Sequence, residues 1–476
     1  MEMKKLVSLL LSAVLVLGLC ACGTHAHQET EPAVPNSLQV GFAREIVMPT
    51  IGTPELDGTA DDRIMTAFMD NLTVTCVALR GINEETVLVY TTDRKASGDD
   101  VFKTVRQEIA QATGIAEDHI MLGATHTHSA PKFAGWDGAN QYVEEWKAAM
   151  VKVGQDALAD LTAAEAYYGS VQTENCVYVR HYKLIDGTVT SSGVSGGDPS
   201  IVGHPAEADQ ELQAIRFDRG EGKKDIILMS FNSHPTWFGG VTETEMSADY
   251  PAPTREHIEA NGDYLVAFFL GDGGNQGPTS KYKPEIPNMP KDYREHGQRL
   301  GQYVLDMIPT MTKATGDEVK LLGQQYAAKT NKEKIDMVAQ ATEVMNIYHS
   351  QGRDAALVAA EKYGFYQHLE ASAIINRARA DETTDVWMNV LSIGNDMSFV
   401  FAPYEMFSES GSYIRANTPY GITLLSTCTN GAVGYLASDE AFEYGCYESF
   451  TGRLARGSAE ELAEEYVAML TQLKNG

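Results

Sequence analysis

The sequence is poor in cysteine and in positive charge, and it has no long apolar run beyond its N-terminal region. Its 37 lysines and arginines stand against 65 aspartates and glutamates, which gives a net charge of −28. This balance excludes a nucleic-acid-binding protein and electrostatic attachment to anionic lipid. No later segment is apolar enough to span a membrane, and we find no internal repeat or low-complexity tract. A large globular body is therefore expected.

The six cysteines are scattered, and none belongs to a Cys-x-x-Cys pair. Four of them lie beyond the N-terminal region: Cys76, Cys176, Cys428 and Cys446. In an exported chain these four could form disulfides, whose connectivity the sequence does not give. Buried free thiols are the other interpretation, and we slightly favour it.

The N-terminus has the pattern of an export signal. Lys4 and Lys5 precede an apolar segment over residues 6–19, which is too short for a comfortable membrane span. The segment ends in a pattern that is typical of a bacterial lipobox with Cys22 as the lipidated residue; ordinary cleavage with free cysteines is the alternative. We predict a signal peptide over 1–22 and a flexible, mostly polar tether over 23–37. The protein is then expected to be exported and lipid-anchored at the bacterial cell membrane, facing outward.

Residues 38–476 are predicted to form one large catalytic domain of the α/β or α+β class, because extended and helical patterns alternate. Strands are predicted over 38–42, 73–79, 87–92, 120–124, 226–231, 264–270, 320–326, 387–393, 398–402 and 422–427. Helices are predicted over 290–308, 332–348 and 353–380, around 101–109 and 142–158, and from Ser458 to the C-terminus. A capping box formed by Ser458 and Glu461 is expected to begin the last helix. The polar region 332–380 could be an excursion from the main body.

The most informative segment is Thr125-His126-Thr127-His128-Ser129, which follows the apolar strand 120–124. In an extended chain, residues i and i+2 point to the same face, so both imidazoles should project into one space. Two converging imidazoles suit a metal ligand with a catalytic neighbour, although such a pair also occurs as a hydrogen-bonded structural pair.

In three further segments, a residue or turn that could bind a metal or an anion follows an apolar strand. His234 precedes a proline at the end of strand 226–231, where it could bind a metal or cap a turn. A glycine-rich turn at 271–277 could cradle an anion or serve only as a tight turn; it lacks the lysine and the spacing of nucleotide-binding loops. Glu405 follows strand 398–402, and a carboxylate buried there needs a partner such as a divalent metal; a solvated loop acid is the alternative.

Together these segments resemble the catalytic domain of the neutral/alkaline (non-lysosomal) ceramidase family. Thr-His-Thr-His-Ser-x-Pro and Asn-x-His-Pro-Thr are its most specific motifs, and Ser247-Ala-Asp-Tyr-Pro251 also resembles its pattern. The resemblance covers about residues 38–455. The family's C-terminal immunoglobulin-like domain is not expected in this sequence.

The resemblance implies one Zn²⁺ per chain with four ligands: His126, His234, Glu405 and Tyr435. The family has two tyrosines twelve positions apart, a spacing that Tyr435 and Tyr447 reproduce, and Tyr447 would donate to the reacting carbonyl. His128 would assist proton transfer. Arg180 would take the role of the substrate-binding arginine, although its neighbours Val179 and His181 depart from the family's Asn-Arg-Arg pattern.

The implied function is zinc-dependent hydrolysis of an N-acyl amide, with ceramide the default substrate, giving a sphingoid base and a fatty acid. Characterised ceramidases carry a functional serine in the glycine-rich turn, where this chain has Gly274. That departure disfavours a serine nucleophile, whereas a zinc-activated water needs no serine. The alternatives are an esterase or deacylase acting on another acylated lipid or glycan, and a non-catalytic ligand-binding lipoprotein that keeps the fold.

Overall fold

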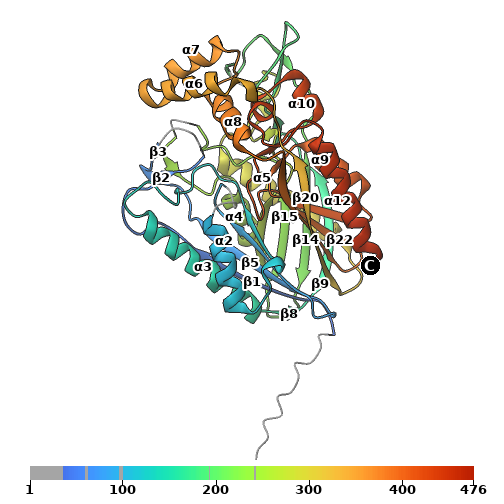
Figure 1. Ribbon diagram of the computed structural model, residues 1–476. Coiled ribbons are helices and arrows are strands. Elements are labelled where there is room, and N and C mark those ends of the chain that lie inside the picture. The colour runs from blue at the N-terminus through green and yellow to red at the C-terminus, as the bar shows by residue number, and fades with distance from the viewer. Residues whose placement is uncertain (1–35, 59–62, 96–99, 192, 241–242) are drawn as a thin grey trace, which may run out of the picture. The chain divides into compact units, whose positions relative to one another are not determined.

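The computed structural model describes residues 36–58, 63–95, 100–191, 193–240 and 243–476 (Figure 1). The predicted signal peptide with Cys22 lies outside these residues, as does most of the predicted tether. The unit Pro35–Gly476 contains both sheets and helices, as the sequence predicts. Among the described residues, no helix has the length and apolarity needed to cross a membrane.

Three larger sheets form the body, and each carries one parallel pair of strands at an edge. The first has the order β7-β6-β5-β1-β8: Ile120–Ala124, Thr86–Thr92, Thr73–Arg80, Gln39–Ile46 and Thr162–Ala163. The second has the order β17-β15-β14-β9-β19: Tyr264–Leu270, Asp225–Phe231, Glu211–Asp218, Glu165–Gln172 and Thr312–Lys313. The third has the order β20-β21-β22-β24: Val319–Lys329, Thr383–Ile393, Met397–Phe401 and Ile422–Ser426. The parallel pairs are β6/β7, β15/β17 and β22/β24.

One hydrophobic core joins the three sheets. Side chains of β5 and β6 such as Val77 and Val89 pack in the same cluster as Leu228 of β15 and Phe399 of β22. Helices cover the outer face of each sheet. The first sheet is covered by α2 (Asp100–Thr113) and α3 (Ala139–Ala159), and the second by α4 (Pro251–Ala260) and α5 (Tyr293–Met307). The third sheet is covered by α9 (Ser408–Asn417) and α12 (Ser458–Asn475). Strands buried on both faces explain the continuous apolar runs in the sequence.

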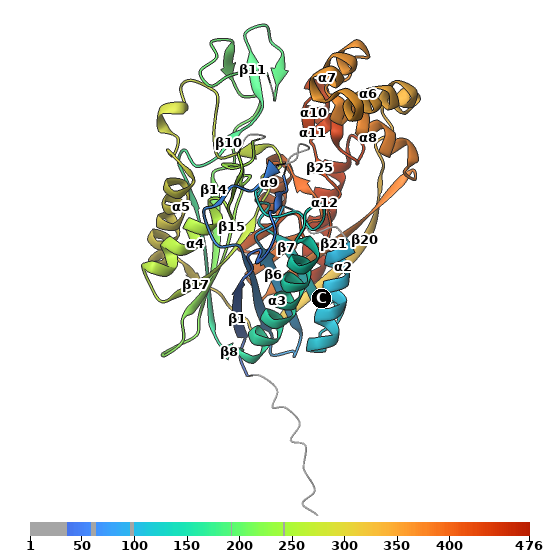
Figure 2. The ribbon, with the colours of Figure 1, turned by 90° about the vertical axis from the view of Figure 1, so that its left-hand side faces the viewer.

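A helical group is inserted between the neighbouring strands β20 and β21. It consists of α6 (Val338–Gln351), α7 (Arg353–Lys362) and α8 (His368–Arg379), which share a small core of their own. Figures 1 and 2 show these helices at one end of the molecule, beside the short helices α10 (Asp439–Tyr444) and α11 (Tyr447–Thr451). The expected excursion over 332–380 is therefore present, but the single helix predicted over 353–380 is wrong. Gly364 adopts a left-handed φ of 69° and ends the helical path between α7 and α8.

Two other local predictions are settled by the described residues. Helix α12 has Gly457 as its N-cap without a side-chain capping bond, so the capping box predicted for Ser458 is wrong. All four cysteines beyond the N-terminal region are buried, and none forms a disulfide. The remaining short strands pair in twos and threes: β2 (Glu55–Leu56), β3 (Arg63–Ile64), β4 (Ala67–Phe68), β10 (Tyr178–Val179), β11 (Tyr182–Leu184), β12 (Val189–Thr190), β13 (Ile201–Gly203), β16 (Glu245–Met246), β18 (Gln276–Gly277), β23 (Glu405–Met406) and β25 (Tyr435–Leu436).

Candidate metal centre

The carboxyl ends of the three parallel strand pairs meet at one place. The backbone N–H of Thr427, just after β24, donates to the carbonyl of Leu270 at the end of β17. The N–H of Asn430 donates to the carbonyl of Leu122 in β7. These bonds hold the edges of the three sheets together, so the loops that leave β7, β15, β17 and β22 are brought to a common site.

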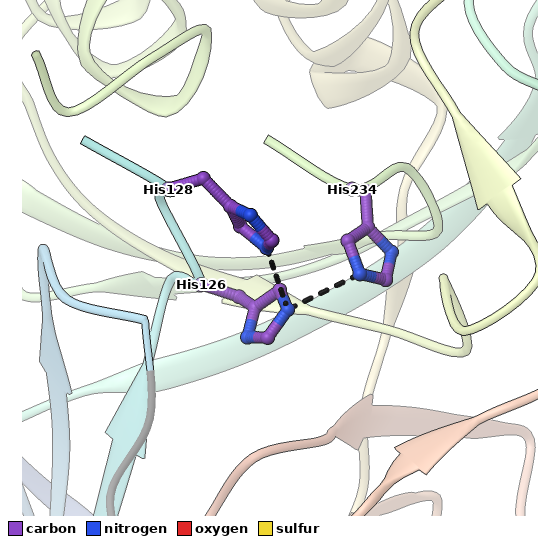
Figure 3. Close-up of side chains that lie close together, drawn as sticks. All are labelled: His126, His128 and His234. Atoms are coloured by element: carbon purple, nitrogen blue, oxygen red, sulfur yellow. Dashed lines mark hydrogen bonds between the residues drawn. The ribbon is translucent and has the colours of Figure 1, made fainter. Parts of the chain in front are cut away.

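Four ligating atoms converge there, each from a segment that the sequence singled out. The Nε2 atom of His126 lies 3.1 Å from Nε2 of His234 and 3.2 Å from Nε2 of His128 (Figure 3). The carboxylate oxygen Oε2 of Glu405 lies 3.2 Å from Nε2 of His126 and 3.0 Å from Nε2 of His234. His126 and His234 are fully buried, which removes these atoms from bulk water.

Hydrogen bonding alone does not account for this cluster. Nε2 of His126 faces three other nitrogen or oxygen atoms at once, yet an imidazole nitrogen carries only one proton or one lone pair. By contrast, ligands bound to zinc at about 2.0–2.1 Å in a tetrahedron lie roughly 3.3 Å from one another. The spacing and the chemistry of the donors therefore fit a zinc ion.

The opposite ring nitrogens support the same interpretation. Nδ1 of His234 lies 2.6 Å from the carbonyl oxygen of Gly273, and Nδ1 of His126 faces the carbonyl of Lys95. An Nδ1–H that donates to a carbonyl leaves Nε2 as the lone pair, which is the usual arrangement of metal-binding histidines. The glycine-rich turn thus orients a ligand, a role that its sequence did not indicate.

His126 reaches the site by a different route from the one predicted. Strand β7 ends at Ala124, and His126 adopts a left-handed φ of 68°, so side-chain alternation along a strand is the wrong explanation for the convergence. The two imidazoles nevertheless meet, as predicted. A non-glycine residue in this region costs of order 1–3 kcal/mol, and such residues cluster at active sites and ligand-binding sites.

Tyr435 lies beside the cluster. Strands β23 and β25 pair in parallel with Glu405 opposite Tyr435, and the ring of Tyr435 stacks near His234 with a centroid separation of 6.3 Å. The structure thus gathers His126, His128, His234 and Glu405 at ligand spacing, with Tyr435 adjacent. The roles of Tyr435 as the fourth ligand and His128 as a proton shuttle stay predictions.

Electrostatics make the cluster receptive to a cation. Burial raises the pKa of Glu405, but the charges and hydrogen bonds of His126 and His234 outweigh it and hold that pKa well below its usual value. Burial and the neighbouring His126 hold the pKa of His128 well below its usual range, and burial together with Arg180 lowers that of His234 to about 4. Burial lowers the pKa of His126, but its interactions with Cys428 and Glu405 outweigh burial and raise that pKa to about 10. In the apo state the ionised carboxylate of Glu405 therefore faces a protonated His126 and two neutral imidazoles, and a bound cation would replace the proton of His126.

Arg180 is fixed next to this centre by a buried ion-pair network. Its Nε donates to Oε1 of Glu448 at 2.8 Å, and its Nη2 donates to the carbonyl oxygen of Gly274 at 2.8 Å. Oε2 of Glu448 lies 2.9 Å from Nε2 of His181. The guanidinium carbon of Arg180 is 5.3 Å from the centroid of the Tyr435 ring. Glu448, to which the sequence analysis gave no role, therefore positions Arg180.

Tyr447 is the remaining predicted site residue, and it is half-buried at the start of α11. Its ring lies 5.7 Å from that of Tyr435 in an edge-to-face arrangement. Burial, reinforced by the charge of Glu405, raises the pKa of Tyr447 to about 12, so its hydroxyl keeps its proton at neutral pH. It is therefore a hydrogen-bond donor beside the cluster, together with Arg180.

Gly274 leaves no room for a side chain. A Cβ atom at this position would lie 2.6 Å from the carbonyl oxygen of Glu405 and 2.7 Å from that of Met406. The Gly274 N–H donates to the latter oxygen, which clamps the glycine-rich turn to the segment that carries Glu405. A serine does not fit in this backbone arrangement.

Comparison with known proteins shows the fold. No family model matches the sequence, and a search of curated proteins finds no match. Among solved structures, neutral ceramidase from Pseudomonas aeruginosa aligns with a TM-score of 0.68 and 15% identity, covering 92% of this chain and 75% of that one. A ceramidase complexed with C2 aligns with a TM-score of 0.64 and 16% identity over the same shares. The chain thus has a neutral-ceramidase-like fold, as the sequence motifs predict.

Proposed function

We propose that this protein is a zinc-dependent hydrolase that cleaves an N-acyl amide, with ceramide as the first substrate to test. The observation that carries the proposal is the convergence of three imidazole nitrogens and one carboxylate at the meeting point of three sheets. Ceramide is chosen because the similar structures are ceramidases, one of them described as complexed with C2. The proposed ligands are His126, His234, Glu405 and Tyr435.

A zinc ion bound by these groups would supply an acidified water, whose pKa falls to about 7. The neutral imidazole of His128 would accept a proton beside the ligands and pass it to the leaving amine. Arg180 and the protonated Tyr447 would donate to the carbonyl oxygen as negative charge develops on it. Burial of the histidines excludes bulk water and strengthens these interactions.

The absence of room at Gly274 favours direct hydrolysis over a covalent route. An acyl-enzyme at this position would need a serine hydroxyl, and the backbone carbonyls of Glu405 and Met406 occupy the volume of its Cβ. Direct attack by water requires no group at that position. It is compatible with amide and with ester substrates, so an esterase or deacylase is the nearest competing function.

The first test measures zinc content and turnover together. The purified protein, incubated with a fluorescent N-acyl amide and with the matching ester, should contain one zinc per chain and hydrolyse the amide. Glu405→Gln should lose most of the zinc and the activity, because it removes the charge that pairs with the histidines. His349→Ala, on the exposed face of α6, is the matched control and should change neither.

The outcomes separate the competing functions. Ester turnover without amide turnover would identify an esterase, and bound zinc without any turnover would indicate a binding protein. Incubation with a lipid extract, followed by mass spectrometry of released fatty acids and amines, would identify the natural substrate.

We also propose that Cys22 carries a lipid that anchors the protein outside the bacterial cell membrane. The support is the short apolar segment that ends in the lipobox-like pattern. Cys22→Ser should release the protein from the membrane fraction while the soluble body stays folded. Unchanged membrane association of this variant would overturn the anchor.

A further inference from the structure

A pocket outside the metal centre has Tyr447 in its lining. It has a volume of about 530 Å³ and lies between α8 and α11, which contact each other. Its lining residues are Leu369, Ser372, Ala373, Asn376, Arg377, Arg379, Ala380, Tyr447, Thr451 and Arg453. Tyr447 therefore borders both the proposed reaction site and this pocket.

The charge of this pocket is opposite to that of the whole chain. Three arginines line it and no carboxylate does, although the chain has a net charge of −28. Within the described residues, none of these three guanidinium groups forms an ion pair. The nearby carboxylate of Glu370 is instead paired with Lys334 at 2.6 Å.

Arg377 gives the strongest indication of an anion site among the three arginines, because its side chain is buried and only 4% exposed. One of its Nη2 protons is donated to the carbonyl of Phe450, which ties α8 to α11, but its buried Nε has no hydrogen-bond partner. Arg379 and Arg453 are exposed, with Nε of Arg453 donating to Thr384. Burial lowers the pKa of Arg377, and the nearby charges of Glu370 and Glu333 offset only part of this effect. Burial of a guanidinium with no carboxylate bonded to it is costly, and an anion that accepts from Arg377 would recover part of that cost.

We propose that this pocket binds an anionic group of the substrate, a carboxylate or a phosphate, through Arg377, Arg379 and Arg453. Planar guanidinium groups suit both anions, because their parallel N–H groups match two oxygens at once. The inference rests on the proposed amide hydrolysis, since Tyr447 links the pocket to the reacting carbonyl. It narrows the substrate class from ceramide, which is neutral, to N-acyl amides that carry a negative charge beyond the amide.

The test compares substrates that differ only in charge. N-dodecanoyl derivatives of glycine, 4-aminobutyrate and 6-aminohexanoate place a carboxylate at increasing distances from the amide, and their primary carboxamides are the neutral partners. A second arm places the carboxylate on the acyl side, as the monoamides of dodecanedioic acid. At the best spacing, kcat/KM should favour the anion about tenfold or more, as expected for one charge-assisted contact.

The variants Arg379→Gln and Arg453→Gln should reduce the ratio of anionic to neutral kcat/KM to below about threefold. Arg456→Gln is the control, because Arg456 is exposed nearby but pairs with Asp439 and Glu443 outside the pocket. Arg377→Lys keeps the charge but not the planar donor set, and should weaken the preference even if Arg377→Gln fails to fold.

Each result decides one of the two proposals. Equal turnover of anionic and neutral amides by every protein overturns the pocket and leaves the hydrolase intact. If no amide is hydrolysed, the proposed function fails, and calorimetry with the same compounds then tests the pocket by itself. Tighter binding of the anion by the native protein than by Arg379→Gln would support it, and equal binding would overturn it.

Discussion

His126 and His128 carry different predicted roles, although their Nε2 atoms lie only 3.2 Å apart. His126 is predicted to bind zinc, so His126→Ala should lose the metal and the activity together. His128 is predicted to transfer protons, so His128→Ala should keep stoichiometric zinc and lose about 10²–10⁴ in turnover, the usual contribution of general acid–base catalysis. Metal analysis of both purified variants, beside their kcat values, checks this division.

The geometry makes this a demanding test, because His128 is as close to His126 as His234 is. A zinc-free His128→Ala would show that His128 is a ligand, and Tyr435 or Glu405 would then lose that role. Tyr435→Phe distinguishes these two cases, since it removes only the hydroxyl: retained zinc in this variant would leave Glu405 among the ligands.

Gly274 gives a second prediction about a single residue. Gly274→Ser restores the residue type that characterised ceramidases have in this turn, yet it should lower both activity and zinc affinity, because the new Cβ displaces the carbonyls of Glu405 and Met406. Gly277→Ser, where a Cβ meets no atom within 4 Å, is the control and should be mild. Zinc titration and kcat/KM of both variants provide the measurement; an increase in activity of Gly274→Ser would contradict the argument.

The sequence singled out residues such as His126, His234 and Glu405, because an imidazole or carboxylate side chain is by its type a candidate metal ligand. It did not identify Glu448 or the carbonyl of Gly273, because their roles depend on which groups the fold brings next to them. Glu448 acquires a function only through contact with Arg180 and His181, residues more than 260 positions earlier. Contacts of this kind leave no local pattern in a single sequence.

Helix capping provides a prediction at the scale of the element. Ser458 lies inside α12 and makes no capping bond, whereas the side chain of Asp292 caps α5 by accepting from the N–H of Glu295 at 2.8 Å. Asp292→Ala should therefore cost about 1 kcal/mol of unfolding free energy, and Ser458→Ala less than about half of that. Denaturant unfolding of both variants checks the order, and a larger loss for Ser458→Ala would restore the capping box.

Elements with strong local patterns were predictable, and elements stabilised by their neighbours were not. The apolar runs of β15 and β17 and the helical spacing of α3 gave correct predictions. Strands β9 and β14 were missed, because Gln213 and Arg216 interrupt the apolar pattern of β14, which nonetheless lies between two partner strands. Helix α4 was missed as well, although Pro251 at its first position is a recognisable start signal.

The position of the site follows from the topology of the whole molecule. His126 leaves a strand of the first sheet, His234 a strand of the second and Glu405 a strand of the third. The sequence placed each residue after a strand, but parallel pairing at three sheet edges is a long-range property that single-sequence periodicity does not contain. This arrangement means that a metal bound there would link all three sheets.

Removal of the metal should therefore lower the free energy of unfolding of the domain as well as its catalytic activity. A ligand that binds only the folded state stabilises it by an amount that rises with the logarithm of the ratio of free ligand concentration to dissociation constant, about 4 kcal/mol when that ratio is a thousand. Chelation should accordingly lower the unfolding temperature by several degrees, and added zinc should restore it. His126→Ala is the control: its unfolding temperature should already be low and should not respond to chelator. If chelation removes zinc from the native protein without changing its unfolding temperature, the three sheet edges are held by their own backbone bonds and the metal serves only the chemistry.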